Sequence, residues 1–97
     1  MKRNLDAPLI DLEGKPFEDG STLRTVCFNA VVANFPDDAN LKPEDKLRLY
    51  GLAKKIYPGG NVDFSAEDLT LIKARVAKSY SSLVMGVIYE MLDADPS

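Results

Sequence analysis

The stretch SSLVMGVIYEMLDADPS, residues 81–97, contains the longest apolar run of the chain. Between Leu83 and Leu92, only Gly86 and Glu90 interrupt a series of Leu, Val, Met, Ile and Tyr residues. A helix with apolar groups on every side must be covered by other protein groups. The run therefore predicts a helix over residues 82–92. Either this helix is the central helix of a monomer, or it is half covered and completed by a partner.

Three further helices are expected upstream, because apolar residues recur there at helical spacing. They cover residues 22–34, 43–57 and 66–78. Pro36 follows the end of the first helix, Pro43 suits the first turn of the second, and Pro58 stops it. Ser65, with Asp68 three residues later, has the form of an N-cap for the third helix.

Extended structure is expected in two places. The segment PLIDLEGKPF, residues 8–17, predicts a small hairpin with strands at 9–12 and 15–17, turning at Gly14. Residues 61–64 read as a short extended segment, and residues 1–7 and 93–97 are expected to fray. The predicted fold is one mainly α domain. It is a compact four-helix domain with a small N-terminal β-hairpin and a short extended segment between the second and third helices.

Composition excludes several kinds of protein. Apolar residues make up 45% and charged residues 28% of the 97 residues, which is ordinary for a globular domain. The longest apolar run has about ten residues, well short of the ~20 that span a bilayer. The N-terminus lacks the apolar segment of a secretory signal peptide. Cys27 is the only cysteine, so a reducing, cytoplasmic location without disulfides is expected.

Catalytic and metal-binding chemistry is not indicated. Histidine is absent, which removes His-dependent triads and His metal sites. Residues 54–68 have the outline of an EF-hand. However, aligning Phe64 with the β position of such a loop places Tyr57 and Gly59 at ligand positions, and Val62 where the turn needs glycine. We therefore expect no calcium binding, no cofactor and no enzymatic activity.

Two kinds of binding remain open. The chain carries a net charge of −3, but residues 42–78 contain eight basic residues against five acidic ones. A nucleic-acid face is one hypothesis, formed by basic residues of the second and third helices: Lys46, Lys54, Lys55, Lys73 and Lys78. Protein–protein interaction or self-association is the favoured hypothesis. Its candidate interface consists of apolar and aromatic residues: Val84, Met85, Tyr89, Tyr80 and Tyr57.

Two single residues carry further expectations. Gly86 lies inside the last helix, where glycine costs about 0.5–1 kcal/mol relative to alanine, so a close helix crossing is expected there. Cys27 shares a face of the first helix with Leu23, Ala30 and Val31, and a buried, inert thiol is expected.

The stretch KLRLYGLAKKIY (residues 46–57), continued by VDFSAEDLTLIKARVAKSYSSLVMGVIYEMLD (residues 62–93), resembles small, poorly characterised proteins of tailed bacteriophages and prophages. The N-terminal PLIDLEGKPF resembles their acidic start less specifically. No chemical motif accompanies the resemblance, so it carries over no functional residue. The resemblance implies a compact phage accessory protein that acts by binding, in virion assembly or in interference with the host. It also implies a location in the bacterial host cytoplasm or on the virion.

Overall fold

The computed structural model describes residues 1–93, apart from the side chain of Asp37. It confirms a mainly α fold with four α-helices and a small antiparallel sheet. The elements in chain order are β1 (Lys2–Asn4), α1 (Leu23–Val32), the 3-10 helix η1 (Pro36–Asn40), α2 (Pro43–Ile56), β2 (Asn61–Asp63), α3 (Ala66–Ser79) and α4 (Ser82–Asp93).

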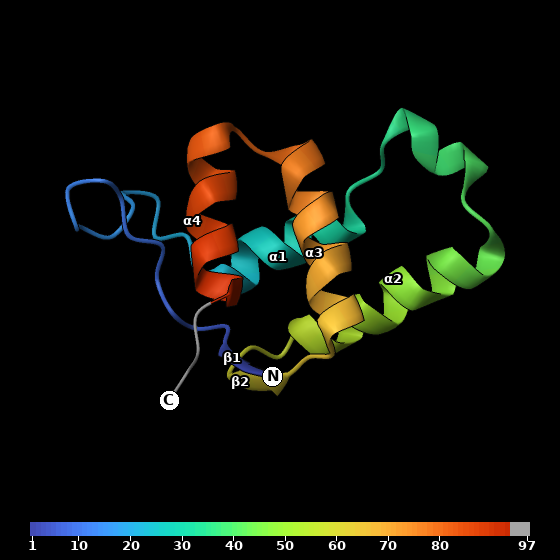
Figure 1. Cartoon of the computed structure of the whole chain (residues 1–97), viewed down its shortest axis with the longest axis horizontal. Coiled ribbons are helices and arrows are strands. Elements are labelled where there is room, and N and C mark those ends of the chain that lie inside the picture. Colours follow the sequence, from blue (N-terminus) through green and yellow to red (C-terminus); the bar gives the residue numbers. More distant parts are fainter. Residues whose placement is uncertain (94–97) are drawn as a thin grey trace.

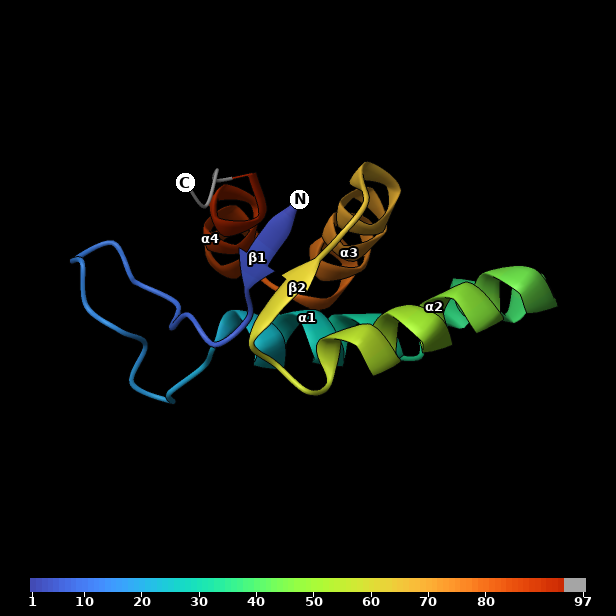
Figure 2. The ribbon, with the colours of Figure 1, turned by 90° about the horizontal axis from the view of Figure 1, so that it is seen from below.

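The helices form two layers, with α1 and α2 in one and α3 and α4 in the other (Figures 1 and 2). Helix α1 packs against α2, α3 and α4. Its N-cap is Thr22, whose hydroxyl accepts a hydrogen bond from the Thr25 amide at 3.3 Å. Its buried face follows the 3.6-residue period and consists of Leu23, Val26, Cys27, Ala30 and Val31. The central helix of the fold is therefore α1.

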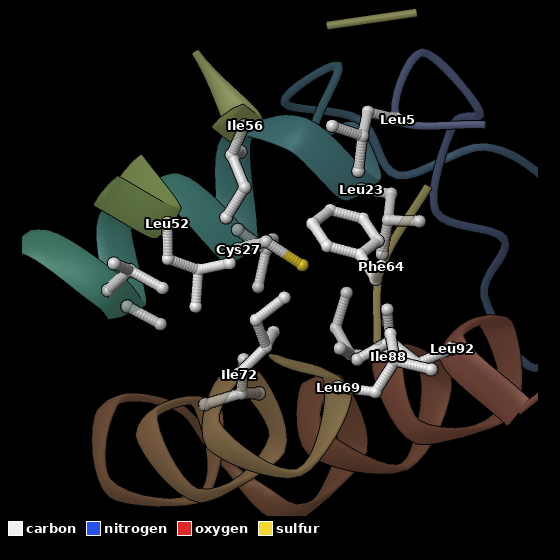
Figure 3. Packing of buried hydrophobic residues seen from close by; sticks show 14 of the residues in the cluster. Leu5, Leu23, Cys27, Leu52, Ile56, Phe64, Leu69, Ile72, Ile88 and Leu92 are labelled. Atoms are coloured by element: carbon white, nitrogen blue, oxygen red, sulfur yellow. The ribbon is translucent and has the colours of Figure 1, made fainter. Parts of the chain in front are cut away.

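The core lies between the two layers. Figure 3 shows Phe64 and Cys27 between the helices of one layer and those of the other. Phe64 is only 1% exposed and reaches this position because it follows β2 directly. Burial raises the pKa of the Cys27 thiol to about 12, which confirms the expected buried cysteine.

Helix α4 is at the edge of the structure rather than at its centre. Only Ile88 and Leu92 are fully buried in it, and Leu83 is 45% exposed. Gly86 was expected at a close helix crossing, and this expectation is wrong. A Cβ added at Gly86 would meet no other atom within 4 Å, because this residue faces outward.

The sheet forms in a different place from the expected hairpin. β1 pairs with β2 in antiparallel register, with Arg3 opposite Val62. Residues 1–7 were expected to fray but are part of the fold, and Leu5 is completely buried. Of the other expected frayed end, Asp93 is the last residue of α4, and residues 94–97 lie outside the described part of the chain.

Residues 9–17 make a tight loop and no strand. The Asp11 amide donates to the Lys15 carbonyl at 2.8 Å, and the Phe17 amide donates to the Leu9 carbonyl at 3.0 Å. Only an isolated bridge joins Ile10 to Pro16. Because proline has no amide hydrogen, the ladder cannot grow through Pro16.

Three arginines complete the C-terminal ends of helices that are distant in sequence. Arg3 donates to the Leu92 carbonyl of α4 at 2.6 Å, and Arg24 donates to the Tyr57 carbonyl that follows α2. Arg75 donates to the carbonyls of Ala30 and Ala33 at the end of α1. Neither α1 nor α4 has a basic residue in its own last turn, so these carbonyls find their donors elsewhere in the chain.

Candidate binding surfaces around α2

A groove lies between α2 and α3. Both helices pack against α1 and diverge from each other. Near the β2 end, two ion pairs join them: Lys55 to Asp68 at 3.2 Å and Arg48 to Glu67 at 3.3 Å. The groove has a volume of about 570 Å³, and Arg48 and Glu67 are part of its lining. We call it the α2–α3 groove.

The α2–α3 groove combines apolar and charged side chains. Its apolar part consists of Leu41, Leu49, Ala66, Leu71 and Ala74. Its charged residues are Asp38, Asp45, Arg48, Glu67, Arg75 and Lys78. A concave, largely apolar surface with charges of both signs is typical of a site that orients a bound molecule by a few polar contacts.

A buried ion pair fixes one part of this groove. Arg75 donates to the two carboxylate oxygens of Asp38 at 2.8 and 3.0 Å, and the side chains are 6% and 11% exposed. The Phe35 ring lies 4.6 Å from the guanidinium, and the Phe35 amide donates to Asp38 at 3.0 Å. Hydrogen bonds from Arg75 and then from Phe35 lower the pKa of Asp38 to about 2. The pair therefore fixes η1 to α3 and to the end of α1.

A second hollow of about 420 Å³ lies between α2 and the end of α1, and it shares Asp38, Leu41, Leu49 and Arg75 with the α2–α3 groove. We call it the α1–α2 hollow. Its apolar lining consists of Val31, Val32, Ala33, Leu41, Leu49, Tyr50 and Ala53, with Lys46 beside them. Val32 is 52% exposed and Tyr50 is 61% exposed, so large apolar surfaces remain open to solvent here.

The outward face of α2 continues this hollow as a stripe of aromatic and basic residues. We call it the α2 stripe, and its members are Lys46, Leu47, Tyr50, Lys54 and Tyr57. Leu47 and Tyr57 are 68% and 60% exposed. The Lys54 ammonium lies 5.1 Å from the centre of the Tyr50 ring. Exposed tyrosines beside cations are a composition found in protein interfaces.

Of the expected interface residues, Tyr57 lies at the end of α2, whereas the other four lie on α4 or directly before it. Val84, Met85 and Tyr80 are partly buried and pack against the core. Tyr89 donates to the Lys73 carbonyl at 3.2 Å, between α4 and α3. Tyr57 belongs instead to the α2 stripe, where Arg24 lies 4.9 Å from its ring.

The five lysines of the nucleic-acid hypothesis also do not form one face. Lys73 pairs with Asp93 of α4, whereas Lys55 pairs with Asp68. Lys78 lies 5.7 Å from the Phe35 ring beside η1. Only Lys46 and Lys54 share a surface, the α2 stripe. A continuous track of cations, which phosphate binding favours, is therefore not present among these residues.

Comparison with known proteins does not identify a family for this chain. No protein-family model, no curated protein and no solved structure matches the chain. Within residues 1–93, no helix has the length and hydropathy to cross a bilayer. Among the same residues, no group of three or more acidic or cysteine side chains is placed to hold a metal ion.

Proposed function

We propose that this protein is a non-enzymatic protein-binding module whose α2–α3 groove takes a short apolar helix of another protein. The observation that carries this proposal is the groove itself, an apolar surface left open because α2 and α3 diverge above α1. Each of these helices has 14 residues, which corresponds to about 21 Å at 1.5 Å per residue. A partner helix of two to three turns, roughly 11–16 Å long, fits between them.

The rim of the groove supports a partner with apolar residues on one face and charged residues beside them. Asp45 and Arg48 lie on the α2 side, and Glu67 and Lys78 on the α3 side. Charges of both signs on each side favour one orientation of a bound amphipathic helix. Because Arg75 and Asp38 already satisfy each other, they hold the groove in place and need no contribution from the partner.

A non-enzymatic role is supported by the structural contacts that the polar groups of the groove make with other groups of the protein. The Thr70 hydroxyl donates to the Ala66 carbonyl at 3.0 Å, which is a helix contact. Arg48 is paired with Glu67 across the groove. A nucleophile activated by a neighbouring base is not found among the described residues that line it.

The biological setting belongs to the same proposal. On the resemblance of residues 46–93, the protein acts as an accessory protein of a tailed bacteriophage or prophage, in virion assembly or in interference with the host. It works in the cytoplasm of the bacterial host or on the virion. The groove is then the surface that meets a phage or host protein.

Affinity capture from a bacterial lysate tests the groove if matched variants are included. Ala74→Glu places a charged side chain in the groove, whereas Ala77→Glu changes an exposed residue of the same helix that does not line it. A partner captured by wild type and by Ala77→Glu, but bound at least about tenfold more weakly by Ala74→Glu, supports the proposal. Equal capture by all three proteins would refute it.

Heparin chromatography separates this function from the alternative, a nucleic-acid-associated regulator using basic residues of α2 and α3. A protein that neutralises phosphates is retained at low salt and released as salt rises, because bound counterions are displaced on binding. We expect this protein to flow through at low salt. Retention that falls steeply with salt, and that Lys46→Glu abolishes, would favour the nucleic-acid function instead.

A further inference from the structure

The loop of residues 10–20 carries exposed apolar side chains on a fixed backbone. Leu12 is 88% exposed and Ile10 is 41% exposed. The Asp11 carboxylate accepts hydrogen bonds from the amides of Glu13 and Lys15 at 2.9 and 3.0 Å, so the turn is ordered by its own contacts. Ordering a loop before binding lowers the entropy cost of the contact that it makes.

The same loop is acidic. It contains Asp11, Glu13, Glu18 and Asp19 against the single cation Lys15, so residues 10–20 carry a net charge of −3. It projects from one end of the molecule, whose longest dimension is 41 Å (Figure 1). The binding surface complementary to such a loop is an apolar hollow with basic residues beside it.

The α1–α2 hollow has these properties. Its walls are mainly apolar, with Val32 and Tyr50 more than half exposed, and Asp38, which also lines it, is neutralised by its ion pair with Arg75. The basic residues Lys46 and Lys54 of the α2 stripe lie beside Tyr50. The hollow is lined by the C-terminal end of α1 and by α2. These parts of the ribbon lie at the opposite end of the molecule from the loop, so the loop of a molecule does not reach its own hollow (Figures 1 and 2).

We propose that the chain self-associates head to tail, with Leu12 of one copy inserted into the α1–α2 hollow of the next. Charge complementarity supports a second copy as the occupant, because the loop is acidic and the hollow has Lys46 and Lys54 at its edge. The two surfaces are different, so the contact is heterologous and leaves a free loop and a free hollow at the ends of each pair. Association therefore continues into chains or closes into a ring.

This contact can be tested separately from the proposed partner-binding function. The α2–α3 groove and the α1–α2 hollow share four lining residues, Asp38, Leu41, Leu49 and Arg75, but neither Leu12, Val32 nor Tyr50 lines the groove. Substitutions at these three residues therefore test self-association without altering the groove. Capture of a partner protein by the same variants reports separately on the groove.

Light scattering after size exclusion is the test, with two interface variants and one control. Leu12→Asp replaces the apolar side chain of the loop by a carboxylate, and Val32→Asp does the same in the hollow. The control Leu83→Asp changes a 45% exposed residue of α4 outside both surfaces. At up to roughly 500 µM, a range that detects weak contacts, wild type and Leu83→Asp should gain mass with concentration. Leu12→Asp and Val32→Asp should each remain monomeric. Tyr50→Glu replaces Val32→Asp if circular dichroism shows that the latter is unfolded.

Mixing the two monomeric variants gives the decisive result. The intact loop of Val32→Asp fits the intact hollow of Leu12→Asp, so an equimolar mixture should form a heterodimer and no larger species. A wild-type protein that stays monomeric throughout this concentration range overturns the proposal. So does a mixture without heterodimer, or a Leu83→Asp variant that loses self-association as fully as the two interface variants.

Discussion

Replacing Arg75 by methionine tests the buried ion pair at the base of the groove. The variant keeps an unbranched apolar stem but removes the guanidinium that contacts Asp38 and the carbonyls of Ala30 and Ala33. It leaves the Asp38 carboxylate, in a side chain only 11% exposed, without its cation. Removing one partner of a buried pair costs about 3–5 kcal/mol.

This loss is large for a protein of 97 residues. Domains are typically stable by about 5–15 kcal/mol, so Arg75→Met should lose a substantial part of the free energy of unfolding. Since a domain of this size loses roughly 4–8 °C in Tm for each kcal/mol, Tm should fall by roughly 12 °C or more. Urea unfolding followed by far-UV circular dichroism at pH 7 measures the free energy directly.

Arg48→Met is the matched control in the same groove. Its pair with Glu67 is exposed, with side-chain exposures of 46% and 82%, and such pairs contribute at most about 1 kcal/mol. The double variant Arg75→Met with Asp38→Ala should be less destabilised than the sum of the single variants, because no charge then remains buried. If Arg75→Met unfolds at the same urea concentration as Arg48→Met, the ion pair does not hold the groove together.

Acid should weaken the protein, because hydrogen bonds from Arg75 and from the Phe35 amide lower the pKa of Asp38 from 3.8 to about 2. A carboxyl whose pKa is lowered by folding stabilises above its unfolded pKa, so the urea midpoint should fall as the pH drops from about 4 to about 2. Asp38→Asn should flatten this dependence, and an unchanged acid profile would contradict the assignment. Cys27 should react with a water-soluble thiol reagent at pH 8 far more slowly in the native protein than in urea, since burial raises its pKa to about 12. Equal rates would place the thiol at the surface. Gly86→Ala should stabilise α4 by about 0.5–1 kcal/mol, because the added Cβ meets no other atom within 4 Å. A lower melting temperature for this variant would reveal a contact at this residue.

The helices could be predicted from the sequence because each one carries a local signal. Periodic apolar residues and caps such as Ser65 with Asp68 act over a few residues, and α2, α3 and α4 lie within a residue or two of their expected limits. The 3-10 helix η1 is not among the elements predicted from the sequence. Two local features favour it: Pro36 fits the first turn of a helix, and the Asp38 carboxylate accepts a hydrogen bond from the Phe35 amide.

The sheet and the binding surfaces could not be predicted in the same way. β1 has the sequence Lys-Arg-Asn, which shows no strand pattern, and it forms because β2 supplies the partner edge. The α2–α3 groove results from the angle between two helices, which apolar periodicity does not encode. The sequence analysis does not predict the α2 stripe as one surface, because it places Tyr57 in the candidate protein interface and Lys46 in the candidate nucleic-acid face.

The three arginines that complete distant helix ends have a consequence for how the protein unfolds. Arg3, Arg24 and Arg75 reach carbonyls that are 89, 33 and 45 residues away in sequence. A helix end capped from so far away gains its hydrogen bonds only after the chain has folded around it, so isolated peptides should fray at these ends. In the intact protein, amides in the last turns of α1 and α4 should exchange with solvent mainly through global opening, which makes these helix ends part of a single cooperative unit.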